Sequence, residues 1–192
     1  MPKIKASFFA VLIVISLFFT HSYLSLAAML SATLHEIGHI IAAKLCNIPL
    51  NRLKLDIFGA SLEIGQGLYP YKSEVILAAA GPTVNIITFL LLIPFLSSPL
   101  PFFELVALSS LFLAILNLLP ILDFDGGRIL SCLLASVFDT TISTKVCSLL
   151  SYITVFLLWI ISVYLMLRLG TSLSLFVFSS ALFVKLFTLH NS

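Results

Sequence analysis

The stretch YLSLAAMLSATLHEIGHIIAAKL, residues 23–45, places the motif His-Glu-Ile-Gly-His at residues 35–39 inside a long apolar run. An apolar run of about twenty residues predicts a helix that crosses a bilayer. Positions i and i+4 of a helix share a face, so His35 and His39 can present two imidazoles to one metal ion. Glu36 is expected to face the same cleft. This stretch therefore predicts a metal site inside a membrane helix.

The motif has the spacing of the H-E-x-x-H zinc signature. In such sites zinc lowers the pKa of a bound water toward neutrality, and a glutamate that is not itself a ligand removes the proton. The chain has four histidines in all, so the whole motif is expected by chance far less than once. We therefore expect His35 and His39 to bind a metal and Glu36 to act as the general base.

The composition points to a membrane for the whole chain. Of its 192 residues, 60% are hydrophobic and 9% are charged. The mean hydropathy of +1.19 is far from that of an ordinary soluble domain. The length fits roughly six helical spans of about twenty residues with short connections. We expect a single membrane domain over residues 1–192, and no basic stripe of the kind that nucleic acid requires is present.

Charges and prolines interrupt the apolar runs and mark the ends of the expected spans. The expected fold class is an all-α polytopic membrane protein of about six transmembrane helices. Residues 53–57 and 60–64 alternate in polarity, which predicts a short membrane-associated β-hairpin after the second helix. A bare strand edge cannot face lipid, so this hairpin should lie at the interface or against protein. The spans are expected at about 6–19, 23–45, 73–96, 103–119, 146–167 and 172–189.

Lysine and arginine then orient the spans, because positive loops stay in the cytoplasm. If six spans alternate, eight basic residues fall on one side: Lys3, Lys5, Lys44, Arg52, Lys54, Lys72, Arg128 and Lys145. The opposite connections carry only Arg168. We therefore expect a multi-pass protein of the cell membrane with both termini cytoplasmic. The N-terminus also resembles a signal peptide, but its cleavage would leave an odd number of spans, so we expect the first span to be retained.

A third metal ligand is expected where the fourth span ends, on the same side of the membrane as the histidines. The chain there reads NLLPILDFDGGR, residues 117–128. Pro120 breaks the helix and Gly126-Gly127 permits a turn, so a carboxylate held there can approach a metal closely. Asp123 and Asp125 are both candidates. Two histidines and one carboxylate, with a fourth position open to water, make a catalytic rather than a structural zinc site.

The motifs together resemble those of the site-2 proteases, zinc metalloproteases that cut substrates within the membrane. The resemblance covers roughly residues 28–132 and leaves the C-terminal helices at 146–189 outside it. It is specific because three motifs agree in order, spacing and membrane context: HEIGH at 35–39, AGPTVN at 80–85, and NLLP at 117–120 followed by DGG at 125–127.

The resemblance implies roles for individual residues. His35, His39 and Asp125 would be the Zn²⁺ ligands, and Glu36 the general base. Asn117 would help to hold the substrate backbone. The family usually has Leu before the ligand Asp and often Pro two residues before it, where this chain has Phe124 and Asp123. We favour Asp125 as the ligand because it stands beside Gly126-Gly127.

The architecture resembles most the bacterial group whose sporulation protease processes a membrane-tethered sigma-factor precursor. We therefore expect a zinc-dependent intramembrane endopeptidase that performs regulated proteolysis of a membrane-tethered protein. Its expected partners are that substrate, the lipid bilayer and membrane regulatory proteins, without direct contact to nucleic acid. The substrate would pair as a strand with the hairpin, because helical peptide bonds are hidden by their own hydrogen bonds.

Two other functions fit part of the sequence. A membrane metal-ion transporter could use the same ligands, but it would not need Glu36 as a base and would usually show internal repeats. A non-proteolytic membrane scaffold would not need the complete set of ligands and base. Asn85 and Asn117 also have a simpler interpretation, since an intramembrane Asn often only bonds a neighbouring helix.

Overall fold

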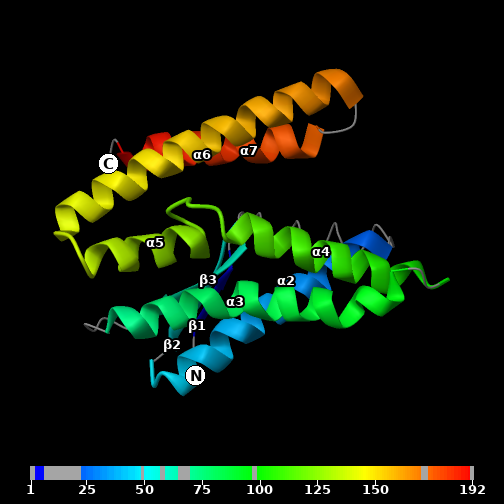
Figure 1. Ribbon diagram of the computed structural model, residues 1–192, viewed down its shortest axis with the longest axis horizontal. Helices are drawn as coiled ribbons and strands as arrows, with labels where there is room; N and C mark the ends of the chain where they lie inside the picture. The colour runs from blue at the N-terminus through cyan, green and yellow to red at the C-terminus, as the bar shows by residue number, and fades with distance from the viewer. Residues whose placement is uncertain are drawn as a thin grey trace. The chain divides into compact units, whose positions relative to one another are not determined.

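The computed structural model describes residues 3–6, 23–48, 50–56, 59–64, 70–96, 99–169 and 173–190. The chain divides into two compact units, residues 1–118 and residues 119–192. The elements in chain order are β1 (Lys3–Ala6), α2 (Tyr23–Leu45), β2 (Leu50–Asp56), β3 (Gly59–Ile64), α3 (Tyr71–Leu92), the short 3₁₀ helix η1 (Ile93–Phe95), α4 (Pro101–Asn117), α5 (Asp125–Ala135), α6 (Thr140–Leu169) and α7 (Leu173–His190) (Figure 1).

In the first unit, α2, α3 and α4 pack against one another (Figure 1). The α2–α3 contact depends on a small residue, because a Cβ at Gly38 would lie 2.8 Å from the carbonyl oxygen of Ala80 and 2.9 Å from Cγ2 of Val84. Small residues at such contacts let two helix backbones approach closely. Gly38 stands between His35 and His39 on α2, so the residues that bear the motif lie against α3.

The contact between α2 and α4 is made by buried serines. Ser110 on α4 donates a hydrogen bond to Ser31 on α2 over 3.0 Å. Ser31 in turn lies within hydrogen-bond distance of the carbonyl oxygens of Ala27, at 2.9 Å, and Val106, at 3.3 Å. Each hydroxyl therefore has a protein partner, which is what a buried polar group in a membrane helix requires.

Helix α2 ends in a turn that folds the chain back onto α3. Asn47 has a φ of 52°, in the left-handed region that commonly closes a helix. The amide of Ile48 then donates to the carbonyl oxygen of Ala43 over 2.9 Å. Ile48, Ala43 and Leu77 belong to one buried apolar cluster. This cluster fixes the end of α2 against the first turns of α3, one turn beyond His39.

The polar interval after α2 contains the paired strands β2 and β3, which run antiparallel with Leu53 opposite Leu62. A third strand joins them, since β1 pairs in parallel with β2, with Ile4 opposite Leu53. The order of the sheet is β1-β2-β3, so β2 is the central strand. Among the described residues, β2 has a strand on each side and β3 has one neighbour, β2.

The expected count of six spans is not supported. Among the described residues, three helices are long and apolar enough to cross a membrane by length and composition: Tyr23–Leu45, Tyr71–Phe95 and Thr140–Arg168. The fourth expected span is the shorter α4, whose 17 residues are limited by Pro101 at its start and by the Asn117 to Pro120 turn at its end. In α7, the apolar helix from Leu175 to Leu186 is also shorter. The first expected span lies, apart from Ala6, outside the described residues.

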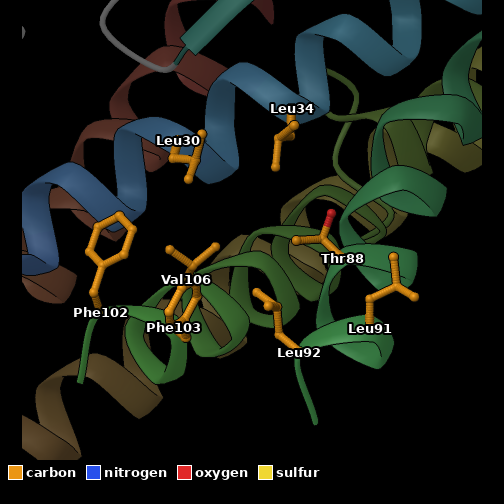
Figure 2. Close-up of a pocket in the computed structure, with 8 residues that line it drawn as sticks. All are labelled: Leu30, Leu34, Thr88, Leu91, Leu92, Phe102, Phe103 and Val106. Carbon is orange, nitrogen blue, oxygen red and sulfur yellow. The ribbon is translucent and has the colours of Figure 1, made fainter. Parts of the chain in front are cut away.

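Residues of the three helices of the first unit also line an open apolar hollow of about 250 Å³ (Figure 2). Its lining comes from α2, α3 and α4, and Thr88 is the only polar residue among the eight that line it. The hydroxyl of Thr88 donates to the carbonyl oxygen of Val84 in its own helix over 2.9 Å. The hollow thus presents no group suited to chemistry.

In the second unit, α6 packs against α5 and against α7. Ser162 on α6 and Ser179 on α7 are buried and their hydroxyl oxygens are 2.9 Å apart. Trp159 donates from its indole nitrogen to Ser180 over 3.2 Å. These contacts hold α6 and α7 together through short polar side chains. That the two units form one domain over residues 1–192 stays a prediction.

Large apolar side chains are exposed along the helices. On α6 these include Leu149 at 61% exposure and Leu167 at 76%. A soluble protein rarely exposes apolar surface on this scale. With the three long apolar helices, this surface identifies the chain as a membrane protein.

Candidate metal centre

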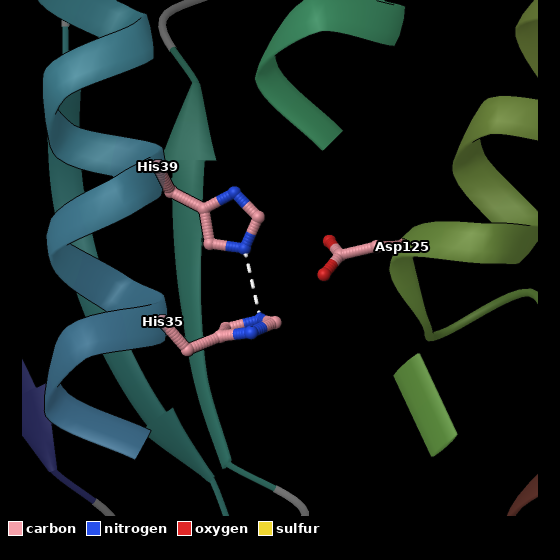
Figure 3. Close-up of side chains that lie close together, drawn as sticks. All are labelled: His35, His39 and Asp125. Atoms are coloured by element: carbon pink, nitrogen blue, oxygen red, sulfur yellow. Dashed lines mark hydrogen bonds between the residues drawn. The ribbon is translucent and has the colours of Figure 1, made fainter. Parts of the chain in front are cut away.

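Two imidazoles face each other on α2. His35 and His39 are 5% and 6% exposed, and their Nε2 atoms are 3.1 Å apart (Figure 3). The rings meet edge to face, at 80°. The i, i+4 spacing that the sequence provides therefore brings both Nε2 atoms to one point beside the helix.

The Nδ1 atoms of these rings contact α3. Nδ1 of His39 donates to the carbonyl oxygen of Leu77 over 2.8 Å, because a carbonyl can only accept. A neutral imidazole carries one proton, so Nε2 of His39 holds a lone pair. Nδ1 of His35 lies 3.1 Å from the side-chain amide nitrogen of Asn85, which is 0% exposed. Such contacts to the second ring nitrogen are typical of histidines that bind metals.

Gly81 on α3 keeps the space in front of the two imidazoles open. A Cβ at this position would lie 2.6 Å from Nε2 of His35 and closer still to Nε2 of His39. Any other residue would therefore occupy the point where the two Nε2 atoms converge. The absence of a side chain at Gly81 leaves room for an ion there, with Pro82 continuing the helix beyond it.

Glu36 follows His35 on α2 and is half-buried, with its Oε2 atom buried. It lies next to the histidine pair without being part of the Nε2 contact. That Glu36 acts as the general base stays a prediction.

The residues of α2 and α3 suit a zinc ion. Two imidazole Nε2 atoms are common zinc ligands, and the carbonyl of Leu77 fixes the tautomer of one of them. Gly81 provides space in front of them. The donor set and the open space both fit the metal that the sequence predicts.

Asn117 is the last residue of α4, and it is half-buried. Its amide nitrogen donates to the carbonyl oxygen of Leu113, one turn earlier in the same helix, over 3.0 Å. That bond orients the amide at the end of α4. The simpler interpretation of an intramembrane Asn, a bond to a neighbouring helix, does not describe this contact.

In the second unit, Asp125 is the first residue of α5 and is 7% exposed. The loop before it is held by Ser151 on α6, whose hydroxyl accepts from the amide of Leu122 over 3.0 Å and donates to the carbonyl oxygen of Pro120 over 3.3 Å. Gly127 allows this loop to close, because a Cβ there would overlap the carbonyl group of Ile121. The start of α5 is therefore a fixed position.

Asp123, the competing carboxylate, is paired with a cation of its own unit. Its Oδ2 atom lies 3.1 Å from Nζ of Lys185 on α7, and both side chains are somewhat more than a quarter exposed. An aspartate in such a pair is less suited to bind a metal than one that is 7% exposed at a helix start.

Several contacts around these residues were not expected from the sequence. The contact of Gly81 with both imidazoles depends on how α2 and α3 pack. Every residue has a backbone carbonyl, so the sequence cannot show that the carbonyl of Leu77 bonds His39. Asn85 does bond a neighbouring helix, as its simpler interpretation holds, but its partner is His35.

The chain resembles known proteins in sequence. The family model described as Peptidase family M50 matches residues 95–161. A relative from Synechocystis sp. whose name describes a zinc metalloprotease is 36% identical over 108 residues, 52% of this chain and 28% of that protein. A zinc metalloprotease of Methanocaldococcus jannaschii is 30% identical over 122 residues, 60% of this chain and 35% of that protein.

These matches support the M50 family for this chain. The chain spans about a third of the length of the curated relatives it matches, 28% and 35% in the two cases. Among solved structures, the site-2 protease from M. jannaschii matches with a TM-score of 0.67 and 22% identity, over 96% of this chain and 89% of that one. This likeness shows that the chain shares the fold of that protease.

Proposed function

We propose that this chain is a zinc-dependent intramembrane endopeptidase of the site-2 protease type. The observation that carries the proposal is the convergence of Nε2 of His35 and Nε2 of His39, 3.1 Å apart, at a position that Gly81 keeps open. The zinc metalloproteases among its relatives support the same activity.

In this proposal Asp125 is the third zinc ligand. Its support is its burial at the first turn of α5 and the bonds of Ser151 that fix the preceding loop. The ion pair of Asp123 with Lys185 supports the choice between the two aspartates. Two imidazoles and one carboxylate are the donor set of a catalytic zinc site.

Glu36 is the general base of the proposed reaction. A zinc ion at the site would lower the pKa of a bound water and polarise the scissile carbonyl. Glu36 would accept a proton from the attacking water and later pass it to the leaving amine. His35 and His39 stay neutral throughout, because each uses its Nε2 lone pair as a ligand.

Asn117 and the sheet are proposed to hold the substrate. The side chain of Asn117 at the end of α4 would bond the substrate backbone near the scissile bond. An unwound substrate would add as a strand to β3, the strand that has one described neighbour. Strand addition would expose peptide bonds that a helix hides.

The proposed substrate is a membrane-tethered protein cut from the cytoplasmic side, and a sigma-factor precursor during sporulation is the specific candidate. Both termini are proposed to be cytoplasmic, since the basic connections would then lie inside. Membrane regulatory proteins are proposed as further partners. The lipid bilayer would surround the apolar faces of the helices.

The test is co-expression of the full chain with a panel of membrane-tethered substrates that includes a sigma-factor precursor. Wild type is expected to cleave at least one of them, and Glu36→Gln to reduce cleavage by about 10²- to 10⁴-fold while leaving zinc binding intact. Equal cleavage by both forms would contradict the proposal. A transporter or a scaffold would keep its function in the variant, so this change also separates the three functions.

A further inference from the structure

We propose that Asn85 is a positioning residue that presents its amide oxygen to Nδ1–H of His35 and so keeps the Nε2 lone pair of His35 for the metal. This inference rests on the proposed zinc site. Asn85 is fully buried on α3, and its amide is 3.1 Å from Nδ1 of His35.

The two histidines need the same arrangement but obtain it differently. Each must carry its proton on Nδ1 if Nε2 is to bind a metal, so each Nδ1–H needs an acceptor. His39 has the carbonyl oxygen of Leu77, which can only accept. His35 has Asn85, whose amide can accept through oxygen or donate through nitrogen.

The orientation of this amide decides the tautomer of His35. With the nitrogen toward Nδ1, the amide donates, the proton of His35 moves to Nε2, and Nε2 of His35 donates to Nε2 of His39 across 3.1 Å. That arrangement leaves His35 no lone pair on Nε2. With the oxygen toward Nδ1, the imidazole donates and its Nε2 lone pair is available.

A half-turn of the amide exchanges these two arrangements, because its two ends have the same shape. Within the described part of the chain, Oδ1 of Asn85 is buried and accepts no hydrogen bond. A buried acceptor without a donor is costly. The half-turn gives this oxygen the Nδ1–H donor of His35, so the metal-binding arrangement also satisfies the oxygen.

The experiment measures the zinc affinity of the purified full chain in detergent by competition with a chromophoric chelator. Asn85→Leu removes the acceptor at similar size, and we expect a loss of about 10- to 100-fold, the usual cost of removing a partner of a metal ligand. Asn85→Asp keeps an acceptor and removes the donor, so it should bind zinc as tightly as wild type or more tightly. Thr88→Val, one turn further along α3, is the matched control and should not change the affinity.

Wild-type affinity in Asn85→Leu would overturn the inference, and so would equal losses in the Leu and Asp variants, since packing or amide donation would then be the role of Asn85. If the Leu variant fails to fold, Asn85→Asp decides alone: retained affinity supports the acceptor role and lost affinity refutes it. Failure of wild type to bind zinc would instead refute the proposed function itself.

Discussion

The α2–α3 pair and the α6–α7 pair both bury polar side chains, but they use them differently. Ser162 and Ser179 bond each other, and each hydroxyl also bonds a carbonyl of its own helix, that of Trp159 or Phe176. The network between α6 and α7 thus satisfies itself and holds two helices together. Polar groups of this kind are structural.

Between α2 and α3, the polar groups instead orient the imidazoles of His35 and His39. The Nδ1 atoms of His35 and His39 contact Asn85 and Leu77 on α3, and the Nε2 atoms converge in front of Gly81. The bonds between these helices therefore orient the two imidazoles and do not only join helices. Changes in α2–α3 should affect metal binding, and changes in α6–α7 should affect stability alone.

The largest effect in this comparison is expected from Gly81→Ala. The added methyl group would overlap both Nε2 atoms, so the imidazoles would have to move apart or rotate. We expect zinc affinity to fall by more than about 100-fold, beyond the usual range for residues that are not ligands. Chelator competition on the purified protein measures this. Thr83→Ala, two residues along α3 and exposed, is the control and should bind zinc normally. Wild-type zinc affinity in Gly81→Ala would show that zinc binding does not depend on the missing side chain at Gly81.

A second test separates the two aspartates of the second unit. Asp125→Asn should lower zinc affinity by more than about 100-fold, because removing a metal ligand costs more affinity than removing a residue that only contacts a ligand. Asp123→Asn should leave the affinity within a few-fold of wild type and lower the free energy of unfolding by about 0 to 1 kcal/mol, since its partly exposed pair with Lys185 is screened by solvent. Equal loss of zinc from both variants would show that the carboxylates share the ligand role.

The smallest effect is expected from Ser179→Ala on α7. It removes one hydrogen bond of the α6–α7 network, and such bonds contribute about 0.6 kcal/mol on average in membrane proteins. Unfolding in mixed detergent should show this small change, and a double-mutant cycle with Ser162→Ala should give a coupling of the same size. Zinc affinity should not change. A loss of zinc from Ser179→Ala would contradict the claim that the polar contacts between α6 and α7 affect stability alone.

The sequence predicted the helices better than their packing. The bounds of α2 matched, because its apolar run ends in a basic residue, Lys44, and its motif has helical spacing. The six-span count is not supported among the described residues, because apolar content does not measure helix length and α4 is limited to 17 residues by its flanking turns. The parallel pairing of β1 with β2 joins residues about fifty positions apart, which no local pattern reveals.

The site was predictable where its residues follow a local pattern. His35, Glu36 and His39 are adjacent on one helix, so spacing alone places them. The contacts of Gly81 and Asn85 with the imidazoles arise only when α3 packs against α2. The pairing of Asp123 with Lys185 joins residues more than sixty positions apart, so no local pattern could have predicted it.

The most direct test of the central claim is the rate of peptide cleavage by the purified protein as a function of the zinc it holds, measured for wild type and Glu36→Gln in parallel. The account predicts that wild-type activity rises in proportion to bound zinc and saturates at one ion per chain, while the variant binds the same zinc and stays inactive. Cleavage by zinc-free wild type, or by zinc-loaded Glu36→Gln at the wild-type rate, would contradict it.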